Sequence, residues 1–324
     1  MNKLQEIQEP IQPFLDGFAQ SYDAALQSRI PIITEAVTRL NQSTGKRIRP
    51  ILVGLMAHLC GKVPTETTVE VAIVLELMHT SSLIHDDVID ESLERRAQPT
   101  LNSIFNNHTA VLVGDFVIAS ALRRASSKLS IEVVQTISTI ACLLSEGELM
   151  QIDLVRRAVS TEQEYFEVIE KKTAILFSAS CSLGAYSVGA DSDMQQCCAE
   201  IGRLLGIAFQ MRDDILDYSN AIETGKPRGN DLREGKATLP LLYALKQASD
   251  EDQSRIRSLM HLPVGDEAVE EIINFSILQG GLTYTQQKID SYIQQAYKLL
   301  ESFPESKAKE SLLALARFIG ERTF

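Results

Sequence analysis

The sequence is poor in aromatic residues and has no excess of positive charge. Aromatic residues make up 6% of the 324 residues, and 31 Lys and Arg stand against 43 Asp and Glu, for a formal net charge of -12. Because a nucleic-acid-binding protein needs a basic face, this balance argues against a nucleic-acid partner. The chain is 44% hydrophobic and 23% charged, an ordinary globular composition that excludes collagen-like, disordered and disulfide-scaffold proteins.

Cysteine is also infrequent, and the spacing of the cysteines matches neither CxxC nor a Cys and His ligand pattern. They are Cys60, Cys142, Cys181, Cys197 and Cys198. We expect them to be reduced core residues of a cytosolic protein. The N-terminal segment MNKLQEIQEPIQPFLDGF has early acidic residues and no apolar run, unlike a secretory signal. The most apolar uncharged stretch, 173–190, contains four serines and two glycines, so no membrane span is predicted.

Proline is absent from residues 100 to 226, which favours long uninterrupted helices. Apolar residues there recur at helical spacing, and strict alternation is nearly absent, so the sequence predicts an all-α protein. No linker or repeat divides it, and we predict a single domain over 1–324. The helices are expected near 5–26, 29–42, 47–60, 66–85, 99–106, 109–127, 130–153, 161–188, 192–218, 234–248, 251–260, 265–278, 280–302 and 305–320, with Thr65 and Ser160 or Thr161 as N-caps and Gly61 as a C-terminal stop.

Six of the 17 aspartates lie in two copies of one pattern, Asp86-Asp87-Val88-Ile89-Asp90 and Asp213-Asp214-Ile215-Leu216-Asp217. Chance predicts roughly 0.05 copies of such a pattern in this chain. On a helix, residues four apart share a face, so each motif presents two carboxylates at a helix C-terminus, where the helix dipole also disfavours anions. This arrangement favours a bound hard cation, and Mg²⁺ bridging carboxylate and diphosphate is the predicted ligand.

Basic residues accompany both motifs and are candidate phosphate ligands, Arg through paired hydrogen bonds and Lys as a point charge. They are Lys46, Arg47 and Arg49 in GKRIRP, Arg95 and Arg96 after the first motif, Lys171 and Lys172 before Thr173, and Lys226 and Lys236 after the second motif. Taken singly, each is an ordinary surface charge.

Together these segments resemble the trans-polyprenyl diphosphate synthases. The resemblance lies in GKRIRP (45–50), HTSSLIHDDVIDESLERR (79–96), Gly114-Asp115, EGE (146–148), KTA (172–174), AFQMRDDILD (208–217) and GKPRGNDLREGKATLPLLYAL (225–245), in the same order and spacing. It covers residues 40 to 320 approximately. One departure is Ala97, where many members have Gly after the paired arginines.

The resemblance implies an all-α, isoprenoid synthase type helical bundle around a central cavity, with the two motifs facing each other across its mouth. It implies that Asp86, Asp90 and Asp213 hold Mg²⁺ and that Asp87, Asp214 and Asp217 support them. The allylic diphosphate would be bound by Arg95, Lys172, Thr173, Gln210, Lys226 and Lys236. Isopentenyl diphosphate would be bound by Lys46, Arg49, His79 and Arg96; for His79, a core position is the competing interpretation.

The chemistry implied is ionisation of the allylic diphosphate, assisted by Mg²⁺ and cationic side chains, followed by attack of the isopentenyl double bond. The growing chain would pass along the helix before the first motif, by Ser81 and Ser82, then Leu77 and Met78. Early-terminating members tend to have bulky aromatic residues at the two serine positions. The small serines and the resemblance to octaprenyl and other long-chain synthases therefore indicate a long all-trans product. Arg123 and Arg124 are expected to face solvent.

Alternatives remain at this point: a shorter-chain synthase, a terpene cyclase, or a non-catalytic partner subunit. A cyclase generally has a different second motif, and a non-catalytic subunit should have lost some of these residues. The family suggests a homodimer. An apolar product implies peripheral membrane contact at most, for product release.

Overall fold

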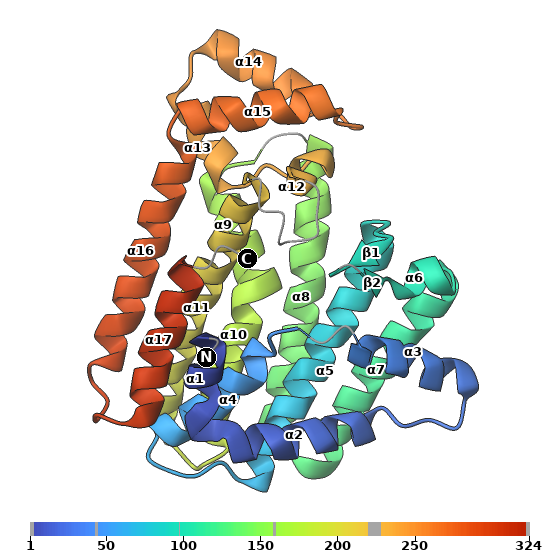
Figure 1. Cartoon of the computed structure of the whole chain (residues 1–324), viewed down its shortest axis with the longest axis vertical. Coiled ribbons are helices and arrows are strands. Elements are labelled where there is room, and N and C mark those ends of the chain that lie inside the picture. Colours follow the sequence, from blue (N-terminus) through green and yellow to red (C-terminus); the bar gives the residue numbers. More distant parts are fainter. Residues whose placement is uncertain (1–2, 43–44, 97, 158–159, 220–227, 322–324) are drawn as a thin grey trace. The chain divides into compact units, whose positions relative to one another are not determined.

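The computed structural model describes residues 3–42, 45–96, 98–157, 160–219 and 228–321. Its regular structure is almost entirely helical (Figure 1), so the all-α prediction is confirmed. Within the described residues the departure is a short antiparallel ladder, in which β1 (Glu94–Arg95) pairs with β2 (Gln98–Pro99).

The chain folds into two compact units. Unit one comprises Met1–Cys142, Leu176–Gly202 and Lys298–Leu315, and unit two comprises Leu143–Ile175, Arg203–Tyr297 and Ala316–Phe324. Long helices that contribute residues to both are α8 (Ile131–Arg157), α11 (Ser192–Asp217), α16 (Gly281–Leu300) and α17 (Lys307–Glu321). The assignment of one domain to residues 1–324 stays a prediction.

Unit one is organised around helix α5 (Glu66–Ile89). This helix lies antiparallel beside α7 (Asn107–Lys128), as Figure 1 shows, with Glu66 next to Lys128 at one end and Ser81 next to Gly114 towards the other. It also contacts α2 (Gln12–Ala25) and α4 (Ile48–Leu59). The remaining elements of the unit are α1 (Lys3–Gln8), the 3₁₀ turn η1 (Glu9–Ile11), α3 (Pro31–Gln42), α6 (Leu101–Ile104) and all but the first residue of α10 (Ile175–Tyr186).

The central helices are buried because they are apolar on every side. Residues 50–57 of α4 and 71–75 of α5 are all buried. Each fully buried Leu or Ile side chain stabilises the fold by about 1.5–3 kcal/mol. Helix α10 packs directly on the backbone of α4, since a Cβ at Gly184 would lie 2.6 Å from the carbonyl oxygen of Val53. The uncharged stretch 173–190 thus supplies a buried core helix.

Unit two contains α9 (Glu162–Ile169), the π-helical turn η2 (Glu170–Ala174), α12 (Asn230–Arg233), α13 (Leu239–Gln247), α14 (Asp250–Leu259) and α15 (Asp266–Leu278). Helices α13, α14 and α15 enclose an apolar cluster that includes Leu241, Ile256 and Ile272, all fully buried. Tyr218, directly after the second aspartate-rich motif, belongs to the same cluster, so the motif is anchored to this core.

Two predicted helix starts are confirmed in detail. Thr65 and Thr68 form a reciprocal capping box at the start of α5, and Thr161 and Glu164 form one at the start of α9. Gly61 has a φ of 78° after α4, the left-handed geometry of a helix stop.

Several predicted boundaries were wrong. The helix expected over 66–85 continues to Ile89 and therefore carries most of the first motif. The helix expected over 161–188 is three segments, because a π turn interrupts it at 170–174. The helix expected over 234–248 begins at Leu239, because Gly235 has a φ of 75° and Pro240 favours a new first turn. The helix expected over 5–26 is divided by the 3₁₀ turn that contains Pro10.

Two expectations about side-chain burial also need correction. Cys181 and Cys198 are buried and the cysteines are free thiols, but Cys142 is exposed. Arg124 does not face solvent: its guanidinium pairs with the buried carboxylate of Glu70 on α5, with Nη2 2.9 Å from Oε1.

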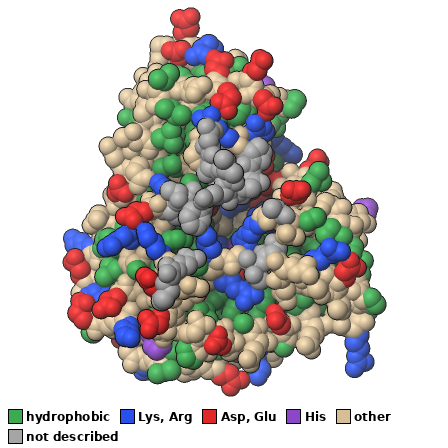
Figure 2. Space-filling view, viewed as in Figure 1, with side chains coloured by type: hydrophobic (Ala, Val, Ile, Leu, Met, Phe, Trp, Pro, Cys, Tyr) green, Lys and Arg blue, Asp and Glu red, His purple; other side chains and the backbone are tan. Residues whose placement is uncertain are grey.

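One described helix, α5, is long and apolar enough to cross a membrane by length and composition. Of its most apolar 18-residue window, 61% is buried inside the protein, the pattern of a core helix. The face shown in Figure 2 carries Asp and Glu side chains intermixed with Lys and Arg.

Candidate active site

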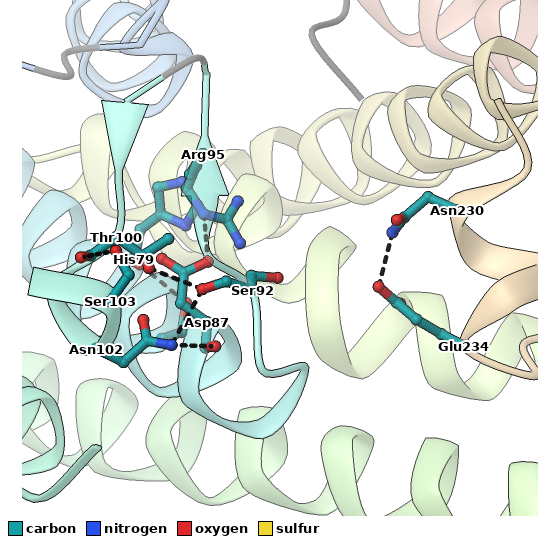
Figure 3. A network of polar contacts seen from close by, with 10 residues as sticks. His79, Asp87, Ser92, Arg95, Thr100, Asn102, Ser103, Asn230 and Glu234 are labelled. Carbon is teal, nitrogen blue, oxygen red and sulfur yellow. Dashed lines mark hydrogen bonds and ion pairs between the residues drawn. The ribbon is translucent and has the colours of Figure 1, made fainter. Parts of the chain in front are cut away.

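The first aspartate-rich motif lies in the last turn of α5. The backbone N–H of Asp90 donates to the carbonyl of Asp86 over 2.8 Å, so these residues are one turn apart and share a helix face. Both are half-buried. Asp87 is buried, and its carboxylate accepts a hydrogen bond of 2.7 Å from Nε of Arg95 in an ion pair (Figure 3). Asp87 is therefore the counter-ion of Arg95, which fits the supporting role predicted for it.

The segment after α5 folds back onto the motif. The side-chain amide of Asn102 donates to the carbonyls of Asp87 and Ser92, at 3.3 and 3.0 Å (Figure 3). The backbone N–H of Ser92 also donates to the Asp87 carbonyl, at 2.9 Å. These contacts fix the start of the β1–β2 hairpin, which carries Arg95.

Arg96, the second of the paired arginines, contacts the GKRIRP segment. Its backbone is left-handed, with a φ of 53°, and its guanidinium packs against Gly45, where any Cβ would collide with it. Lys46, next to Gly45, is half-buried. The two basic segments of unit one, 50 residues apart, therefore meet. Ala97 lies outside the described residues.

Arg49 is a half-buried cation at the start of α4. Its guanidinium carbon lies 5.4 Å from the centre of the Phe177 ring. The pKa of Arg49 is lowered to about 10, mainly by burial and to a smaller extent by Arg96, and the carboxylate of Glu76 opposes this shift. Glu76 is half-buried as well, its buried Oε2 has no hydrogen-bond partner, and the loss of solvent raises its pKa. Glu76 was not predicted from the sequence, because a single glutamate in an apolar helix belongs to no recognisable motif.

His79 lies one turn after Glu76 on α5. Its pKa is far below the ordinary value because it is buried and because Arg49, Arg96 and Arg95 are near. The imidazole is therefore neutral at physiological pH and has one N–H donor. The residue as a whole is half-buried and lies near the basic cluster, so it is not a fully buried core histidine.

The residues predicted to control chain length lie on α5 before the first motif. Leu77, Met78 and Ser81 are buried, and Ser82 is half-buried. The hydroxyl of Ser81 donates to the carbonyl of Gly114 on α7 over 2.9 Å. A side chain larger than Ser at position 81 would therefore press on α7.

The second motif has the same sequence pattern and different partners. Asp214 is fully buried and accepts hydrogen bonds from the Tyr165 hydroxyl at 2.5 Å and the Gln210 amide at 3.0 Å. Burial and the nearby Asp231 raise its pKa well above the ordinary value. Asp213 is half-buried. Tyr165, on α9, was not predicted from the sequence, since it lies 49 residues away from its partner.

Asp217 holds the chain that follows the motif. Its two carboxylate oxygens accept the backbone N–H groups of Asn230 and Asp231, at 2.9 and 3.2 Å, and its carbonyl accepts that of Gly229 at 2.8 Å. Thus Asp217 fixes the end of the polar segment 219–233 by binding the first residues of α12.

Lys172 lies in the π turn η2 and faces helix α8. Its ammonium contacts the carboxylate of Glu148 and donates to the side-chain oxygen of Gln151 over 3.1 Å. The next residue, Thr173, donates from its hydroxyl to Gln210 over 2.8 Å. Gln210 thereby links Thr173 to Asp214. The predicted residues Lys172, Thr173 and Gln210 therefore form one connected group with the second motif.

Lys236 pairs with Glu234 two residues earlier, at 2.5 Å. Glu234 also accepts from the Asn230 side chain at 2.6 Å (Figure 3). Lys226 lies outside the described residues.

The aspartates predicted to bind metal fit a hard cation by their chemistry. Asp86, Asp90 and Asp213 offer carboxylate oxygens, and among the described residues no three His, Cys, Asp or Glu side chains converge into a closed cage. Mg²⁺ commonly takes one or two protein carboxylates and completes its shell with phosphates and water. The carboxylates of each motif are therefore of the chemical type that suits a hard cation shared with a phosphate-bearing substrate.

Comparisons with known proteins agree with this chemistry. A family model described as polyprenyl synthetase matches residues 30–275. The octaprenyl diphosphate synthase of Haemophilus influenzae is 34% identical over 99% of this chain and 98% of its own. Component 2 of the heptaprenyl diphosphate synthase of Bacillus subtilis is 33% identical over 96% of this chain and 88% of its own.

Among solved structures, a polyprenyl synthase from Caulobacter crescentus, complexed with calcium and isoprenyl diphosphate, superposes with a TM-score of 0.92. It is 30% identical, over 99% of this chain and 98% of that one. These matches define the chain as an enzyme that transfers prenyl groups, with the all-α fold of the polyprenyl synthases. It belongs to the polyprenyl synthetase family.

Proposed function

We propose that the protein condenses isopentenyl diphosphate with an allylic diphosphate, farnesyl or geranylgeranyl diphosphate, to form a long-chain all-trans polyprenyl diphosphate with release of diphosphate. The observation that carries the proposal is the doubled aspartate motif, each copy accompanied by half-buried cations such as Arg95 and Lys172. The names of the relatives, octaprenyl and heptaprenyl diphosphate synthases, support a long product.

In this proposal Asp86, Asp90 and Asp213 hold Mg²⁺, which would neutralise the diphosphate and assist its departure. The calcium in the Caulobacter relative supports a divalent cation. Asp87, Asp214 and Asp217 act through their neighbours: Asp87 orients Arg95, Asp214 orients Gln210, and Asp217 fixes the start of α12.

The two substrates are assigned to different groups of residues. Lys46, Arg49, His79 and Arg96 bind isopentenyl diphosphate in unit one, where the contact of Arg96 with Gly45 brings the basic segments together. Arg95, Lys172, Thr173, Gln210, Lys226 and Lys236 bind the allylic diphosphate. Their cationic and N–H groups would stabilise the charge that develops on the departing diphosphate, and the isopentenyl double bond would then attack the allylic carbon.

The product chain is assigned a path along α5, by Ser81 and Ser82 and then Met78 and Leu77, within a central cavity. The small serines leave room for elongation, which favours a long product over a shorter, geranylgeranyl-type one. A homodimer is proposed as well; exposed apolar side chains on unit one, Leu112 at 68% and Ile131 at 63% exposure, provide a surface for it. We place the enzyme in the cytoplasm, with peripheral membrane contact at most.

The test is incubation of the purified protein with Mg²⁺, labelled isopentenyl diphosphate and farnesyl or geranylgeranyl diphosphate, followed by chromatography of the dephosphorylated products. A ladder that ends at a long polyprenol is the expected result. A ladder that ends at twenty carbons would contradict the long-chain assignment, and a hydrocarbon made from the allylic substrate alone would indicate a cyclase.

A second candidate is a chain that elongates only with another protein component. The name of the Bacillus subtilis relative, component 2, favours this candidate. The same assay separates the two: an inactive purified protein that becomes active when a cell extract is added would indicate a required partner.

A further inference from the structure

The EGE segment at residues 146–148 has no role in the functions assigned so far. It lies on α8 and faces the π turn η2, so that two Glu–Lys pairs form side by side within unit two. Glu146 pairs with Lys171 at 2.6 Å, and Glu148 pairs with Lys172. Gly147 lies between them.

The two pairs differ in burial. The side chains of Glu146 and Lys171 are 56% and 30% exposed, whereas those of Glu148 and Lys172 are 12% and 21% exposed. Because an exposed ion pair contributes little and a buried one is costly to break, only the second pair can hold its lysine firmly. The structure thus contains a strong pair and a weak pair of the same chemistry.

Gly147 is required for this close approach. A Cβ on Gly147 would lie 2.8 Å from Cγ of Lys172, 2.9 Å from Cβ of Lys171 and 3.3 Å from the backbone N of Lys172. The π turn adds a residue to the helix and directs Lys172 towards α8, and such turns are frequent at functional sites. Glycine at 147 and the π turn at 170–174 are therefore two parts of one contact.

We propose that Glu148 is a positioning residue that holds the ammonium of Lys172 in place for the allylic diphosphate. Lys172 has three donors, of which one is directed at Gln151, and Oε2 of Glu148 contacts the ammonium as an ion pair without a well-directed hydrogen bond. An incoming diphosphate can therefore take up the ammonium without first breaking a directed bond to Glu148. The inference rests on the proposed function, because it needs Lys172 to bind the allylic substrate.

The experiment is a double-mutant cycle with Glu148→Gln, Lys172→Gln and their combination, read as the KM for farnesyl diphosphate and, separately, for isopentenyl diphosphate. Lys172→Gln removes the charge that binds the diphosphate and Glu148→Gln removes the ion pair that holds that charge, so each single variant should raise the KM for farnesyl diphosphate by about tenfold or more. In the Lys172→Gln background, Glu148→Gln should add no further change, and the KM for isopentenyl diphosphate should stay constant.

The matched control is the same cycle at Glu146 and Lys171, which should leave both KM values within about twofold of the wild type. The positioning role of Glu148 is contradicted if Glu148→Gln changes the KM for farnesyl diphosphate by the same factor with and without Lys172. It is also contradicted if Glu146→Gln changes that KM equally. Gly147→Ala provides a second variant that leaves every charge in place; it should raise the same KM, and an unchanged KM would contradict the close-contact argument. Far-UV circular dichroism checks that each variant is folded.

An inactive wild-type protein would count against the proposed function itself. An active wild type in which the two cycles give equal results would count against the role of Glu148 alone.

Discussion

The two aspartate-rich motifs have the same residue pattern and opposite electrostatic surroundings. The middle aspartate of the first, Asp87, is paired with a cation, Arg95. The corresponding residue of the second, Asp214, has a tyrosine hydroxyl and an amide as partners, and burial raises its pKa. The last aspartate of each motif also has a different structural position. Asp90 is the C-cap of α5, whereas Asp217 accepts hydrogen bonds from the backbone that starts α12.

This difference shows that two copies of one sequence motif can have different roles in the same protein. The carboxylate of Asp87 orients the guanidinium of Arg95, whereas burial and Asp231 raise the pKa of Asp214 against the opposing effect of its two hydrogen-bond donors. We infer that the first motif organises charge, and that the second organises the hydrogen-bonded group of Tyr165, Gln210 and Thr173.

The largest expected effect tests what the two motifs share. Asp86→Ala and Asp213→Ala should each reduce kcat by about a hundredfold to a thousandfold or more, because each removes a group that stabilises charge at the departing diphosphate. Steady-state rates at saturating Mg²⁺ measure this loss, with helix content as the control. Near-normal turnover in either variant would remove that aspartate from the metal site.

The next effect separates the two groups of cations. Arg96→Ala should raise the KM for isopentenyl diphosphate by about tenfold to a hundredfold and leave that for the allylic substrate nearly unchanged, because a charge-assisted contact to one substrate is lost. Lys172→Ala should do the reverse. Equal weakening of both substrates by either variant would contradict the assignment of these cations to different substrates.

A stability comparison tests the two middle aspartates directly. Asp87→Asn should lower the free energy of unfolding by about 1.5–3 kcal/mol, the contribution of a hydrogen bond to a charged group, and leave Arg95 without its carboxylate. Asp214→Asn should cost about 1 kcal/mol or less, because its environment already disfavours the charge. Urea denaturation at neutral pH without divalent metal measures both. A larger loss of unfolding free energy in Asp214→Asn than in Asp87→Asn would show that stability depends more on the charge of Asp214 than on that of Asp87.

A smaller effect concerns the pH dependence of isopentenyl diphosphate binding. The pKa of Arg49 is lowered to about 10, so Arg49 is charged below that pH and loses its proton as the pH rises through it. The KM for isopentenyl diphosphate should therefore be constant up to about pH 9 and rise by up to about tenfold per unit above pH 10. Glu76 raises the pKa of Arg49, whereas Arg96 lowers it, so Glu76→Gln should move this rise to lower pH. An identical pH profile in the variant would exclude Glu76 as the counter-ion.

The smallest change in rate is expected from Ser81→Phe, which should shorten the product rather than stop the reaction. A phenyl ring at this position would occupy the space next to Gly114 that the serine hydroxyl now contacts. Product chromatography against length standards measures the change, and Ser82→Ala is the conservative control. A product of unchanged length would move the proposed path of the chain away from Ser81.

The sequence by itself determined the fold class, most helix positions and the family. The proline-free stretch, the helical spacing of apolar residues and the caps at Thr65 and Thr161 depend on local physics, which a sequence displays directly. The doubled motif and the neighbouring basic segments were equally visible, because their spacing along the chain carries the chemistry.

Only the tertiary structure decided what each charged group contacts. The π turn at 170–174, the buried Oε2 of Glu76, the hydrogen bond from Tyr165 to Asp214 and the one from the start of α12 to Asp217 depend on residues that no local pattern connects. A pKa depends on burial and on charges brought near by folding, so identical DDxxD sequences acquired different partners. Helix periodicity predicts which side chains share a face, whereas packing between helices decides what that face meets.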